Sequence, residues 1–495
     1  MGRRATLIAS LVEPPRADGA SLAALAGRAD WLEVRADLVG DLAADWLRER
    51  FPGRLLYTLR SRAEGGAFEG GRERRRQRLV EAGAGYDWVD LEGDRDLDGE
   101  LLDAIGPARR LISWHGAPAD LAGLRARFEH LAATPAAYYK LVPWASRSGE
   151  ELPALALAAE LGRTDLVAFA GGPTGAWTRL IAPRLGASLV YAAAGEAPAA
   201  PGQIPLDRLL ADYGLPELPP LRALCGVVGH PALHSLSPRL HNAAYRALGV
   251  PALYLPFDVE HFGDFWLEVV ESEQLPRLGL PLAGLSVTTP HKEVAFVVAG
   301  ATSPLAQRLQ AVNTLTPRAG VWEGESTDAE GVLAALAARG VAVRGRLAAV
   351  VGCGGAGRAA AVGLAHAGAR VALVNRGAER GLAAAKSLGL PFVPLAEFDV
   401  SRFDLFVHAT PLGRAAADEL PLPVARLAPG TAVVDLVYGE EPTRLVAEAR
   451  RRGLVAVDGR EVLLRQAAPQ FRAMTGRELP IELAARTLGL DEAAR

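Results

Sequence analysis

Short apolar, β-rich segments alternate with helical stretches along the first 195 residues of this 495-residue chain. Stretches with helical spacing, such as Leu22–Gly27 and Ala119–Ala132, separate most of these segments. Eight strands that alternate with helices over about 200 residues predict an α/β fold, a (β/α)8 TIM barrel. An open doubly wound sheet is the alternative. The segments are Thr6–Val12, Trp31–Asp37, Leu55–Arg60, Trp88–Glu92, Arg110–His115, Tyr138–Val142, Leu166–Ala170 and Ser188–Tyr191.

Polar side chains in or directly after these strands favour the barrel. Active sites of (β/α)8 barrels lie at the C-terminal ends of the strands. The positions therefore predict an active site at that end: Glu33, Arg35, Arg60, Glu64, Glu92, His115 and Lys140.

A proline-rich passage follows, and the alternation restarts beyond it. We expect a linker at Gly214–Leu221, because proline stiffens the chain and ends helices. Strands are predicted beyond it at Leu224–Val228, Ala252–Pro256 and Leu282–Val287, with a helix at Pro238–Leu248.

A glycine-rich turn then joins a predicted strand, Leu347–Val351, to a helix that runs through Ala367. The turn reads Gly352-Cys353-Gly354-Gly355-Ala356-Gly357, and a second strand follows at Arg370–Val374. This βαβ unit is typical of a Rossmann dinucleotide site. Further strands are expected at Leu405–His408 and Ala432–Leu436, and the last part, Arg465–Leu488, is expected to be helical.

Lysine is scarce in this chain. Lys and Arg total 54, yet only Lys140, Lys292 and Lys386 are lysines. Arginine stays protonated near neutral pH, so it cannot serve as an amine nucleophile or a proton donor. Lys140 and Lys292 are therefore candidate catalytic groups, with a snorkelling or surface lysine as the structural alternative. Lys386 lies in an Ala/Leu helical stretch and is interpreted as a surface residue.

Lys140 lies in an aromatic, apolar strand, Tyr138-Tyr139-Lys140-Leu141-Val142. A neutral amine there can attack a ketone and form a Schiff base, which is an electron sink for proton loss at the adjacent carbon. His115 on the preceding strand is a candidate base and Glu64 a candidate partner that orients it. A buried structural histidine is the alternative for His115.

These motifs resemble the type I 3-dehydroquinate dehydratases, in the order of that family and over nearly the whole segment. The matching residues are Leu32–Asp37, Thr58–Arg60 with Glu64-Gly65-Gly66, Ser113-Trp114-His115, Tyr139-Lys140, Gly175–Arg179 and Ala200–Gln203.

The resemblance implies that Lys140 forms an imine with the substrate ketone and that His115, paired with Glu64, moves the proton. It implies that Arg179 binds the substrate carboxylate. It also implies that four residues bind the substrate hydroxyls and keep the site ordered: Glu33, Arg35, Arg60 and Gln203. Two positions depart from the family: Ala199 where serine is usual, and Thr178 where serine is usual.

Lys292 lies where a strand end, a turn and a helix start meet, in Val287-Thr288-Thr289-Pro290-His291-Lys292-Glu293. Reduction of a ketone by hydride requires a proton donor at the oxygen, which lysine can supply. Asp328, directly before a predicted helix, is a candidate carboxylate partner.

The second half resembles shikimate dehydrogenase from about Leu221 to Leu488. The matching segments are Gly226–Pro231, His234–Pro238, Val287–Glu293, Ala311–Thr314, Gly324–Gly331, the glycine turn, Asn375-Arg376, Ala409–Gly413, Asp435–Tyr438 and Leu464–Ala467.

The resemblance implies a catalytic pair of Lys292 and Asp328, and a substrate carboxylate site at Ser235 and Ser237. It also implies contacts to hydroxyls or a role in shaping the pocket for Thr288, Asn313, Asp328, Tyr438 and Gln466. Ser326 departs from the usual asparagine.

Arg376 and Arg380, after the second Rossmann strand, would attract a 2′-phosphate and favour NADP(H). Gly377 replaces a usual threonine there and removes a hydroxyl, which weakens that preference. The residues expected at the cofactor are Gly352, Gly354, Gly355, Ala356, Gly357, Asn375, Arg376, Arg380 and Thr410.

The order of domains resembles the plant bifunctional enzymes. We expect residues 1–213 to form the dehydratase barrel and 214–221 the linker. Residues 222–328 with 465–488 would form the substrate-binding domain, and 329–464 the NADP-binding domain. The predicted reactions are dehydration of 3-dehydroquinate and NADPH-dependent reduction to shikimate. The alternatives are a quinate or shikimate dehydrogenase that uses NAD, and a ligand sensor without catalysis.

The composition limits other functions. The net charge of −3 favours neither nucleic acid nor an anionic membrane. Two cysteines are too few for a disulfide framework or a four-thiolate metal site, and no apolar run reaches a membrane span. We therefore expect a cytoplasmic enzyme without a metal, whose partners are small molecules and whose oligomeric state is open.

Overall fold

The computed structural model describes residues 4–413, 420 and 422–490. Its contacts divide the chain into two compact units. The first holds residues 1–224, 231–233 and 251–282, and the second holds 225–230, 234–250 and 283–495. The domain boundaries expected from the sequence stay predictions.

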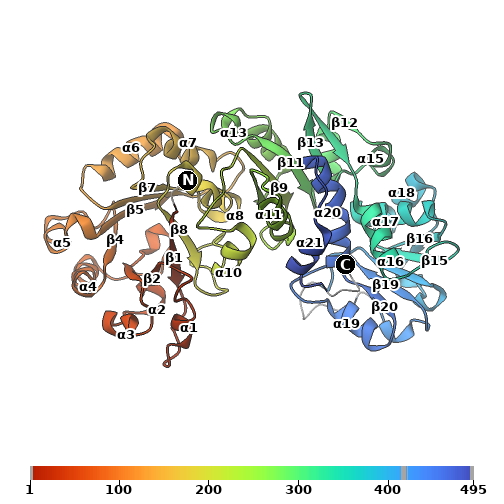
Figure 1. The fold of residues 1–495 in the computed structure, drawn as a ribbon, viewed down its shortest axis with the longest axis horizontal. Helices are drawn as coiled ribbons and strands as arrows, with labels where there is room; N and C mark the ends of the chain where they lie inside the picture. The colour runs from red at the N-terminus through yellow and green to blue at the C-terminus, as the bar shows by residue number, and fades with distance from the viewer. Residues whose placement is uncertain (1–3, 414–419, 421, 491–495) are drawn as a thin grey trace. The chain divides into compact units, whose positions relative to one another are not determined.

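Eight parallel strands curve into a nearly closed barrel in the first unit (Figure 1). Their order is β7-β6-β5-β4-β3-β2-β1-β8. The predicted barrel is therefore confirmed and the open doubly wound sheet is not found. The strands are β1 Thr6–Leu11, β2 Trp31–Arg35, β3 Arg54–Thr58, β4 Trp88–Glu92, β5 Arg110–Gly116, β6 Tyr138–Pro143, β7 Leu166–Ala168 and β8 Leu189–Ala193.

The second strand is shorter than predicted. It ends at Arg35, and Ala36 and Asp37 open the short helix α2 (Ala36–Val39) instead. The guanidinium of Arg35 donates to both carboxylate oxygens of Asp37, at 2.9 and 2.8 Å, across this bend.

Helices occupy most of the connections between the barrel strands, as in a βα repeat. They are α1 Ala20–Ala23, α2, α3 Ala44–Arg48, α4 Arg72–Gly85, α5 Gly99–Ala104, α6 Leu121–Ala132, α7 Leu152–Leu161, α8 Gly172–Gly175, α9 Thr178–Ile181 and α10 Leu206–Arg208.

One end of the barrel is closed by an apolar cluster. Trp31 stacks on Trp88 with ring centroids 4.0 Å apart, and Ile8, Leu56 and Leu111 are buried in the same cluster. Buried polar residues fill the strands beyond this layer, among them Glu33, Asp90 and Lys140. The strand sequences thus divide the barrel interior into an apolar floor and a charged upper part.

Residues 251–282 of the first unit form strand β10 (Ala252–Asp258) and helices α12 (Phe262–Phe265) and α13 (Gln274–Arg277). Phe257 of β10 packs against Trp177 of the barrel, with ring centroids 5.3 Å apart.

In the second unit, β9 (Ala223–Gly229), β11, β13, β14 and β12 follow one another in a mixed sheet. The hairpin of β13 and β14 was not predicted from the sequence. Its turn places Ala319 at φ 48° and Gly320 at φ 82°, the left-handed pair of a tight hairpin. The strands are β11 Leu282–Val287, β12 Ala301–Thr302, β13 Thr314–Arg318 and β14 Val321–Glu325, and the helices are α11 Ser237–Leu248, α14 Lys292–Val298 and α15 Pro304–Leu309.

The third sheet is parallel, in the order β17-β16-β15-β18-β19-β20, as predicted for a Rossmann fold. Alternate residues of β15 enter two different cores: Ala348 and Val350 one, Ala349 and Val351 the other. The sheet is therefore covered on both faces, which explains its continuous apolar strands. The elements are β15 Leu347–Val351, β16 Arg370–Asn375, β17 Phe392–Pro394, β18 Leu405–His408, β19 Ala432–Asp435, β20 Val455–Val457, α16 Asp328–Ala338, α17 Gly355–His366, α18 Ala378–Leu388 and α19 Arg444–Arg451.

The C-terminal part is helical, as expected, and forms two helices. Helix α20 (Gly459–Thr475) begins with a capping box of Asp458 and Glu461, and ends at Gly476, whose φ is 68°. Helix α21 (Ile481–Thr487) follows. The left-handed glycine ends the helical hydrogen bonding and redirects the chain. No helix among the described residues is long and apolar enough to cross a membrane.

Candidate active sites

A cavity of ≈ 420 Å³ opens at the C-terminal ends of the barrel strands. It is lined by eight of the barrel residues that the sequence singled out: Glu33, Arg35, Arg60, Glu64, His115, Lys140, Arg179 and Gln203. Glu92 does not line it; this carboxylate is buried and accepts from Arg60 and from the N–H of Ser61. Parallel strands that end at one rim bring residues together that lie far apart in the sequence.

Lys140 is buried in β6, and its Nζ lies 3.2 Å from Oδ2 of Asp90. The same Nζ lies 4.5 Å from the ring centroid of Tyr191. Asp90 Oδ2 also accepts from Arg60 at 2.6 Å, so the amine and the guanidinium share one carboxylate oxygen. Lys140 is thus held inside the barrel and does not extend towards solvent.

Asp90 is a site residue that the sequence reasoning missed. It is 1 % exposed, and burial opposes its charge while Arg60 and Lys140 favour it, so that its pKa is lowered overall. The signal was present in the strand Trp88-Val89-Asp90-Leu91-Glu92, because Asp90 and Glu92 are two apart and share one face.

His115 and Glu64 form the predicted pair. Nδ1 of His115 lies 3.0 Å from Oε2 of Glu64, and the backbone N–H of His115 donates to the same oxygen at 3.1 Å. Arg60 donates to this oxygen at 3.0 Å. Burial, followed by the charges of Arg60 and Lys140, lowers the pKa of His115 well below its usual value. Burial raises the pKa of Glu64 to about 8. The neutral imidazole is the form that can accept a proton.

Arg179 is a buried cation whose guanidinium forms no ion pair with a carboxylate among the described residues. It is 6 % exposed, and its guanidinium carbon lies 4.8 Å from the ring centroid of Phe169. Its Nε is buried and makes no hydrogen bond within the described part of the chain. Burial lowers the pKa of Arg179 to about 10. An uncompensated buried charge is costly, so this residue is prepared for an anion from outside.

The loop that carries Ala199 is anchored through its backbone. Arg35 donates to the carbonyl of Ala199 at 3.1 Å, and Oε1 of Gln203 accepts from its N–H at 2.6 Å. The amide of Gln203 also donates to Ser10 at 3.1 Å. Both backbone groups of Ala199 are therefore held without the hydroxyl that serine would add.

Two further barrel residues support the site. Glu33 accepts from Ser10 at 2.5 Å and from Thr58 at 2.8 Å. Thr178 accepts from the N–H of Ala170 at 2.9 Å and donates to the carbonyl of Gly175 at 2.7 Å. A serine could make both bonds of Thr178, so this departure keeps the local hydrogen bonding.

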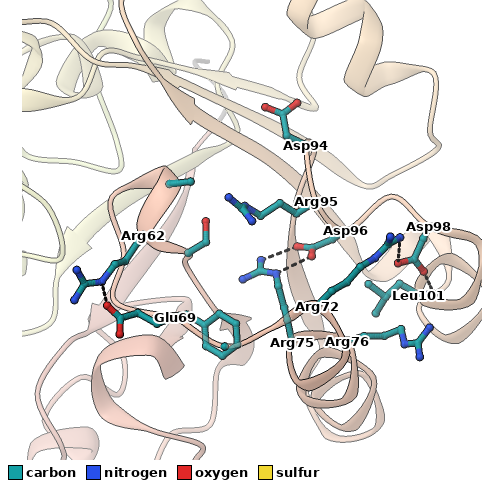
Figure 2. A pocket seen from close by; sticks show the side chains of 14 residues that line it. Arg62, Glu69, Arg72, Arg75, Arg76, Asp94, Arg95, Asp96, Asp98 and Leu101 are labelled. Atoms are coloured by element: carbon teal, nitrogen blue, oxygen red, sulfur yellow. Dashed lines mark hydrogen bonds and ion pairs between the residues drawn. The ribbon is translucent and has the colours of Figure 1, made fainter.

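A second hollow of ≈ 470 Å³ lies beside the loops that follow β3 and β4 (Figure 2). Arg75 donates to both oxygens of Asp96 at 2.7 Å, and Arg62 and Arg72 pair with Glu69 and Asp98. Its arginines face acidic partners, so we interpret it as a support for these loops.

In the second unit, Lys292 and Asp328 meet as predicted. Lys292 Nζ lies 2.5 Å from Oδ2 of Asp328, and the amide of Asn313 donates to Oδ1 at 3.0 Å. Oδ1 of Asn313 accepts from the N–H of Thr327 at 3.0 Å. Each of the two catalytic candidates is the first residue of a helix, α14 or α16. Asn313 thus fixes the carboxylate that orients the amine.

The other residues predicted to bind substrate in this half lie on several separate elements. Ser235 and Ser237 are buried, and the N–H of Ser237 donates to Oγ of Ser235 at 3.2 Å. Thr288 follows β11 and donates its N–H to Val228 at 2.9 Å. Gln466 lies on α20, and Tyr438 is half-buried after β19.

A cavity of ≈ 580 Å³ joins the glycine turn to Lys292 and to the segment after β18. All nine residues that the sequence assigned to the cofactor line it except Gly357: Gly352, Gly354, Gly355, Ala356, Asn375, Arg376, Arg380 and Thr410. Gly357 does not line the cavity but allows the turn to form, because a Cβ there would lie 1.9 Å from the carbonyl oxygen of Gly352.

The shape of this turn fits a dinucleotide. Gly352 has φ 111°, and a Cβ on it would lie 2.6 Å from the carbonyl oxygen of Ala409. Gly354 is the N-cap residue of helix α17, and as a glycine it has no side chain to cap the first backbone N–H groups. The first amides of such a helix form a phosphate site. Arg376 is exposed beside it, and Arg380 lies 3.4 Å from Glu293.

Known proteins match both halves of the chain. Residues 9–217 match the family model of type I 3-dehydroquinase, and residues 227–315 that of the shikimate dehydrogenase substrate binding domain. A shikimate dehydrogenase (NADP(+)) of Acidiphilium cryptum is 44% identical over 255 residues, which cover 51% of this chain and 90% of that protein. The chain belongs to the shikimate dehydrogenase family. Its first half is a type I 3-dehydroquinase.

Other relatives agree with this membership. The bifunctional 3-dehydroquinate dehydratase/shikimate dehydrogenase of Arabidopsis thaliana, described as chloroplastic, is 29% identical over 91% of this chain and 79% of that protein. The solved shikimate dehydrogenase of Aquifex aeolicus is 30% identical with a TM-score of 0.50, over 54% of this chain and 97% of that one.

Residues 348–467 of the dehydrogenase half also match a model of the FAD binding domain. This range holds the glycine turn and the parallel third sheet. Dinucleotide sites for FAD and NAD(P) share this βαβ design, so the match reports the fold rather than the choice of cofactor.

Proposed function

We propose that the barrel dehydrates 3-dehydroquinate and that the dehydrogenase half reduces the product, 3-dehydroshikimate, to shikimate with NADPH. The family membership of each half and the two separate lysine sites support this pair of reactions. Shikimate supply for aromatic amino acid biosynthesis is the corresponding role. We also propose a cytoplasmic location and small molecules as the partners.

In the barrel, Nζ of Lys140 attacks the substrate ketone carbon, and water leaves as the imine forms. His115 takes a proton from the adjacent carbon, and the electron pair moves into the imine as an enamine. Loss of the hydroxyl one carbon further returns the electrons, and His115 gives its proton to that oxygen, which leaves as water. Hydrolysis of the imine frees the enone and restores Lys140.

The buried guanidinium of Arg179 is the strongest support for 3-dehydroquinate as the substrate of the barrel. Its buried guanidinium lines the same cavity as Lys140 and His115 and has an unpartnered Nε. A substrate carboxylate supplies the missing charge and can take two parallel N–H bonds. Its binding there would place the ring of 3-dehydroquinate inside the barrel mouth.

Borohydride trapping tests the imine. Incubation with 3-dehydroquinate and borohydride should add the mass of the reduced substrate to the peptide that contains Lys140. The variant Lys140→Met should remain unlabelled. Label on another residue, with Lys140 unmodified, would contradict the assignment.

In the dehydrogenase half, NADPH supplies a hydride to the ketone carbon when it is bound. Lys292 holds a proton for the ketone oxygen, and Asp328 orients the amine through the 2.5 Å contact. Asn313 keeps Asp328 in place from the other side. Lys292 can donate the proton that an arginine at this position could not.

An assay of the whole reaction tests both activities. With 3-dehydroquinate and NADPH, the protein should produce enone absorbance followed by loss of NADPH absorbance. Neither signal would appear if the chain were a ligand sensor without catalysis.

Coenzyme choice is a separate question. Arg376 favours the 2′-phosphate of NADP(H), whereas Gly377 lacks the hydroxyl that would add a contact. We propose NADPH as the preferred reductant. A higher kcat/KM with NADH than with NADPH would instead support the alternative of an NAD-dependent quinate or shikimate dehydrogenase.

A further inference from the structure

A row of three hydrogen-bonded side chains, Asp435, His408 and Thr410, connects strands β19 and β18 to the cofactor cavity. His408 is the last residue of β18, and its ring is fully buried. Its Nδ1 lies 2.9 Å from Oδ1 of Asp435, and its Nε2 lies 2.5 Å from Oγ1 of Thr410. Asp435 ends the neighbouring strand, directly opposite His408 in the register. Thr410 lines the cavity of the glycine turn.

The hydrogens of this chain can be assigned from the partners. Asp435 Oδ1 also accepts from the N–H of Val437 at 3.0 Å, and Oδ2 accepts from Thr443 at 2.6 Å. A carboxylate surrounded by donors only accepts, so Nδ1 of His408 carries a hydrogen. In the neutral ring Nε2 is then an acceptor, and the hydrogen on this side comes from the hydroxyl of Thr410.

The hydrogen bonds of the Thr410 hydroxyl show what it can still offer to a ligand. Its hydroxyl hydrogen points to His408, and its oxygen accepts from the N–H of Leu412 at 3.3 Å. A hydroxyl oxygen has two lone pairs. Among the contacts of the described residues, this leaves one acceptor position for a ligand and no hydrogen to donate.

We propose that His408 is a positioning residue that makes Thr410 a pure acceptor towards the dinucleotide. The matching ligand group is a donor: the carboxamide N–H of nicotinamide or a ribose hydroxyl. This inference rests on the proposed NADPH site. Asp435 contributes by fixing the ring tautomer, as a carboxylate behind a histidine commonly does.

A set of four variants separates this role from a purely structural one. His408→Asn places an amide N–H near Nδ1, so it can keep the bond to Asp435 while it loses the bond to Thr410. Thr410→Val removes the hydroxyl and keeps the shape, and Thr410→Ser keeps the hydroxyl. The fourth variant combines His408→Asn with Thr410→Val.

The dissociation constant of NADPH, measured by calorimetry, is the first readout. His408→Asn and Thr410→Val should each weaken binding roughly 3- to 10-fold, the range of one hydrogen bond. The double variant should bind no more weakly than Thr410→Val alone, and Thr410→Ser should bind like the wild type. Multiplication of the two single effects in the double variant would overturn the proposal, as would unchanged binding by His408→Asn.

The second readout needs no cofactor. In the free protein, nitrogen NMR of the His408 ring should show a protonated Nδ1 and an unprotonated Nε2. A protonated Nε2 would overturn the proposal even if binding changed. Failure of the wild type to bind NADPH would overturn the proposed cofactor site and with it the ligand part of the inference, while the ring signals would still report the hydrogen bond to Thr410.

Discussion

Arg179 shows how a single residue can be costly to the fold and useful to function. A guanidinium buried against Phe169, with an unpartnered Nε, opposes folding because the charge has left water without a counter-charge. A substrate carboxylate would accept a hydrogen bond from this unpartnered N–H and would supply the counter-charge. Stability and binding should therefore respond to this side chain in opposite directions.

Replacement of Arg179 by methionine tests this opposition. The variant should raise the free energy of unfolding by about 1–3 kcal/mol, since a buried group without partners is removed. It should also raise the KM for 3-dehydroquinate more than roughly tenfold, the loss expected for a charge-assisted pair. Urea unfolding and steady-state kinetics provide the two measurements. The exposed Arg184→Met is the matched control and should change neither.

His115 predicts the pH dependence of dehydration. Burial and the charges of Arg60 and Lys140 lower its pKa, so the neutral base persists as the pH falls through 6.5. We expect kcat/KM for 3-dehydroquinate to stay level there and to decline only at lower pH. An acid limb centred at 6.5 or above would contradict this expectation.

The same shift has a consequence for stability. Below pH 6.5 the unfolded chain binds a proton on His115 that the folded protein excludes, so stability contributed by this group falls as the pH decreases. Urea midpoints at several pH values, compared with those of His115→Asn, should isolate this contribution.

At the scale of elements, short turns depend on a few residues that fix how closely two segments approach. The glycine turn between β15 and α17 contains four glycines, but only some of them need to lack a side chain. Gly352 requires it for a positive φ, and Gly357 for the contact with the carbonyl of Gly352, whereas a Cβ on Gly354 would meet nothing within 4 Å.

Gly357→Ala should therefore impair the cofactor site. A Cβ 1.9 Å from the Gly352 oxygen must displace α17 from the turn, and we expect at least a tenfold weaker binding of NADPH. Dehydratase activity should persist, because the barrel lies in the other unit. Gly263→Ala, at a position outside this turn where a Cβ would meet nothing within 4 Å, is the control and should leave NADPH binding unchanged. Unchanged binding by Gly357→Ala would contradict the steric argument.

The loops after β3 and β4 depend on a different kind of link. Arg75 of α4 donates to both oxygens of buried Asp96 (Figure 2). It also donates to the carbonyl of Leu59. Asp96→Ala removes the carboxylate that accepts two of these bonds and leaves Arg75 with Glu92 at 3.4 Å, so it should cost about 1–3 kcal/mol.

Loss of dehydratase activity in urea reports this effect, because these loops include Glu64. The half-exposed Asp94→Ala, whose partner is Arg127 at the surface, should cost less than about 1 kcal/mol. A similar cost for both variants would show that the Arg75–Asp96 link does not support the loops.

At the scale of the whole molecule, the two lysine sites draw all their described contacts from their own units. Lys140 binds Asp90 in the first, and Lys292 binds Asp328 in the second. Each reaction should therefore continue when the other site is disabled.

A mixture of Lys140→Met and Lys292→Met proteins tests this independence. Neither variant alone should convert 3-dehydroquinate to shikimate, whereas the mixture should, after a lag in which the free intermediate accumulates. Product analysis by chromatography over time measures the lag. A mixture that stays inactive, although each variant retains its own half-reaction, would show that the intermediate must pass within one chain.

The fold was predictable where patterns are local. Eight apolar segments alternate with helices, and strand Trp88–Glu92 has the same bounds in the structure as in the prediction. The hairpin at Thr314–Glu325 was missed, because its Ala319-Gly320 turn lacks the Asn-Gly signal and its strands are half-exposed. The stretch Arg465–Leu488 is helical as expected, and Gly476 separates it into α20 and α21 by its backbone conformation, a break that the sequence analysis did not place.

The sequence by itself determined the residue types and their order along the chain: the lysines Lys140 and Lys292 in motifs of two enzyme families, a candidate base at His115, and a glycine-rich turn within a βαβ unit. These are local properties that need no neighbours. Only the tertiary structure decided which charges meet. Asp90 between Lys140 and Arg60, the unpartnered Nε of Arg179, and the ring of His408 between Asp435 and Thr410 depend on contacts across strands. Burial and distance set the strength of such contacts, and neither quantity exists until the chain has folded.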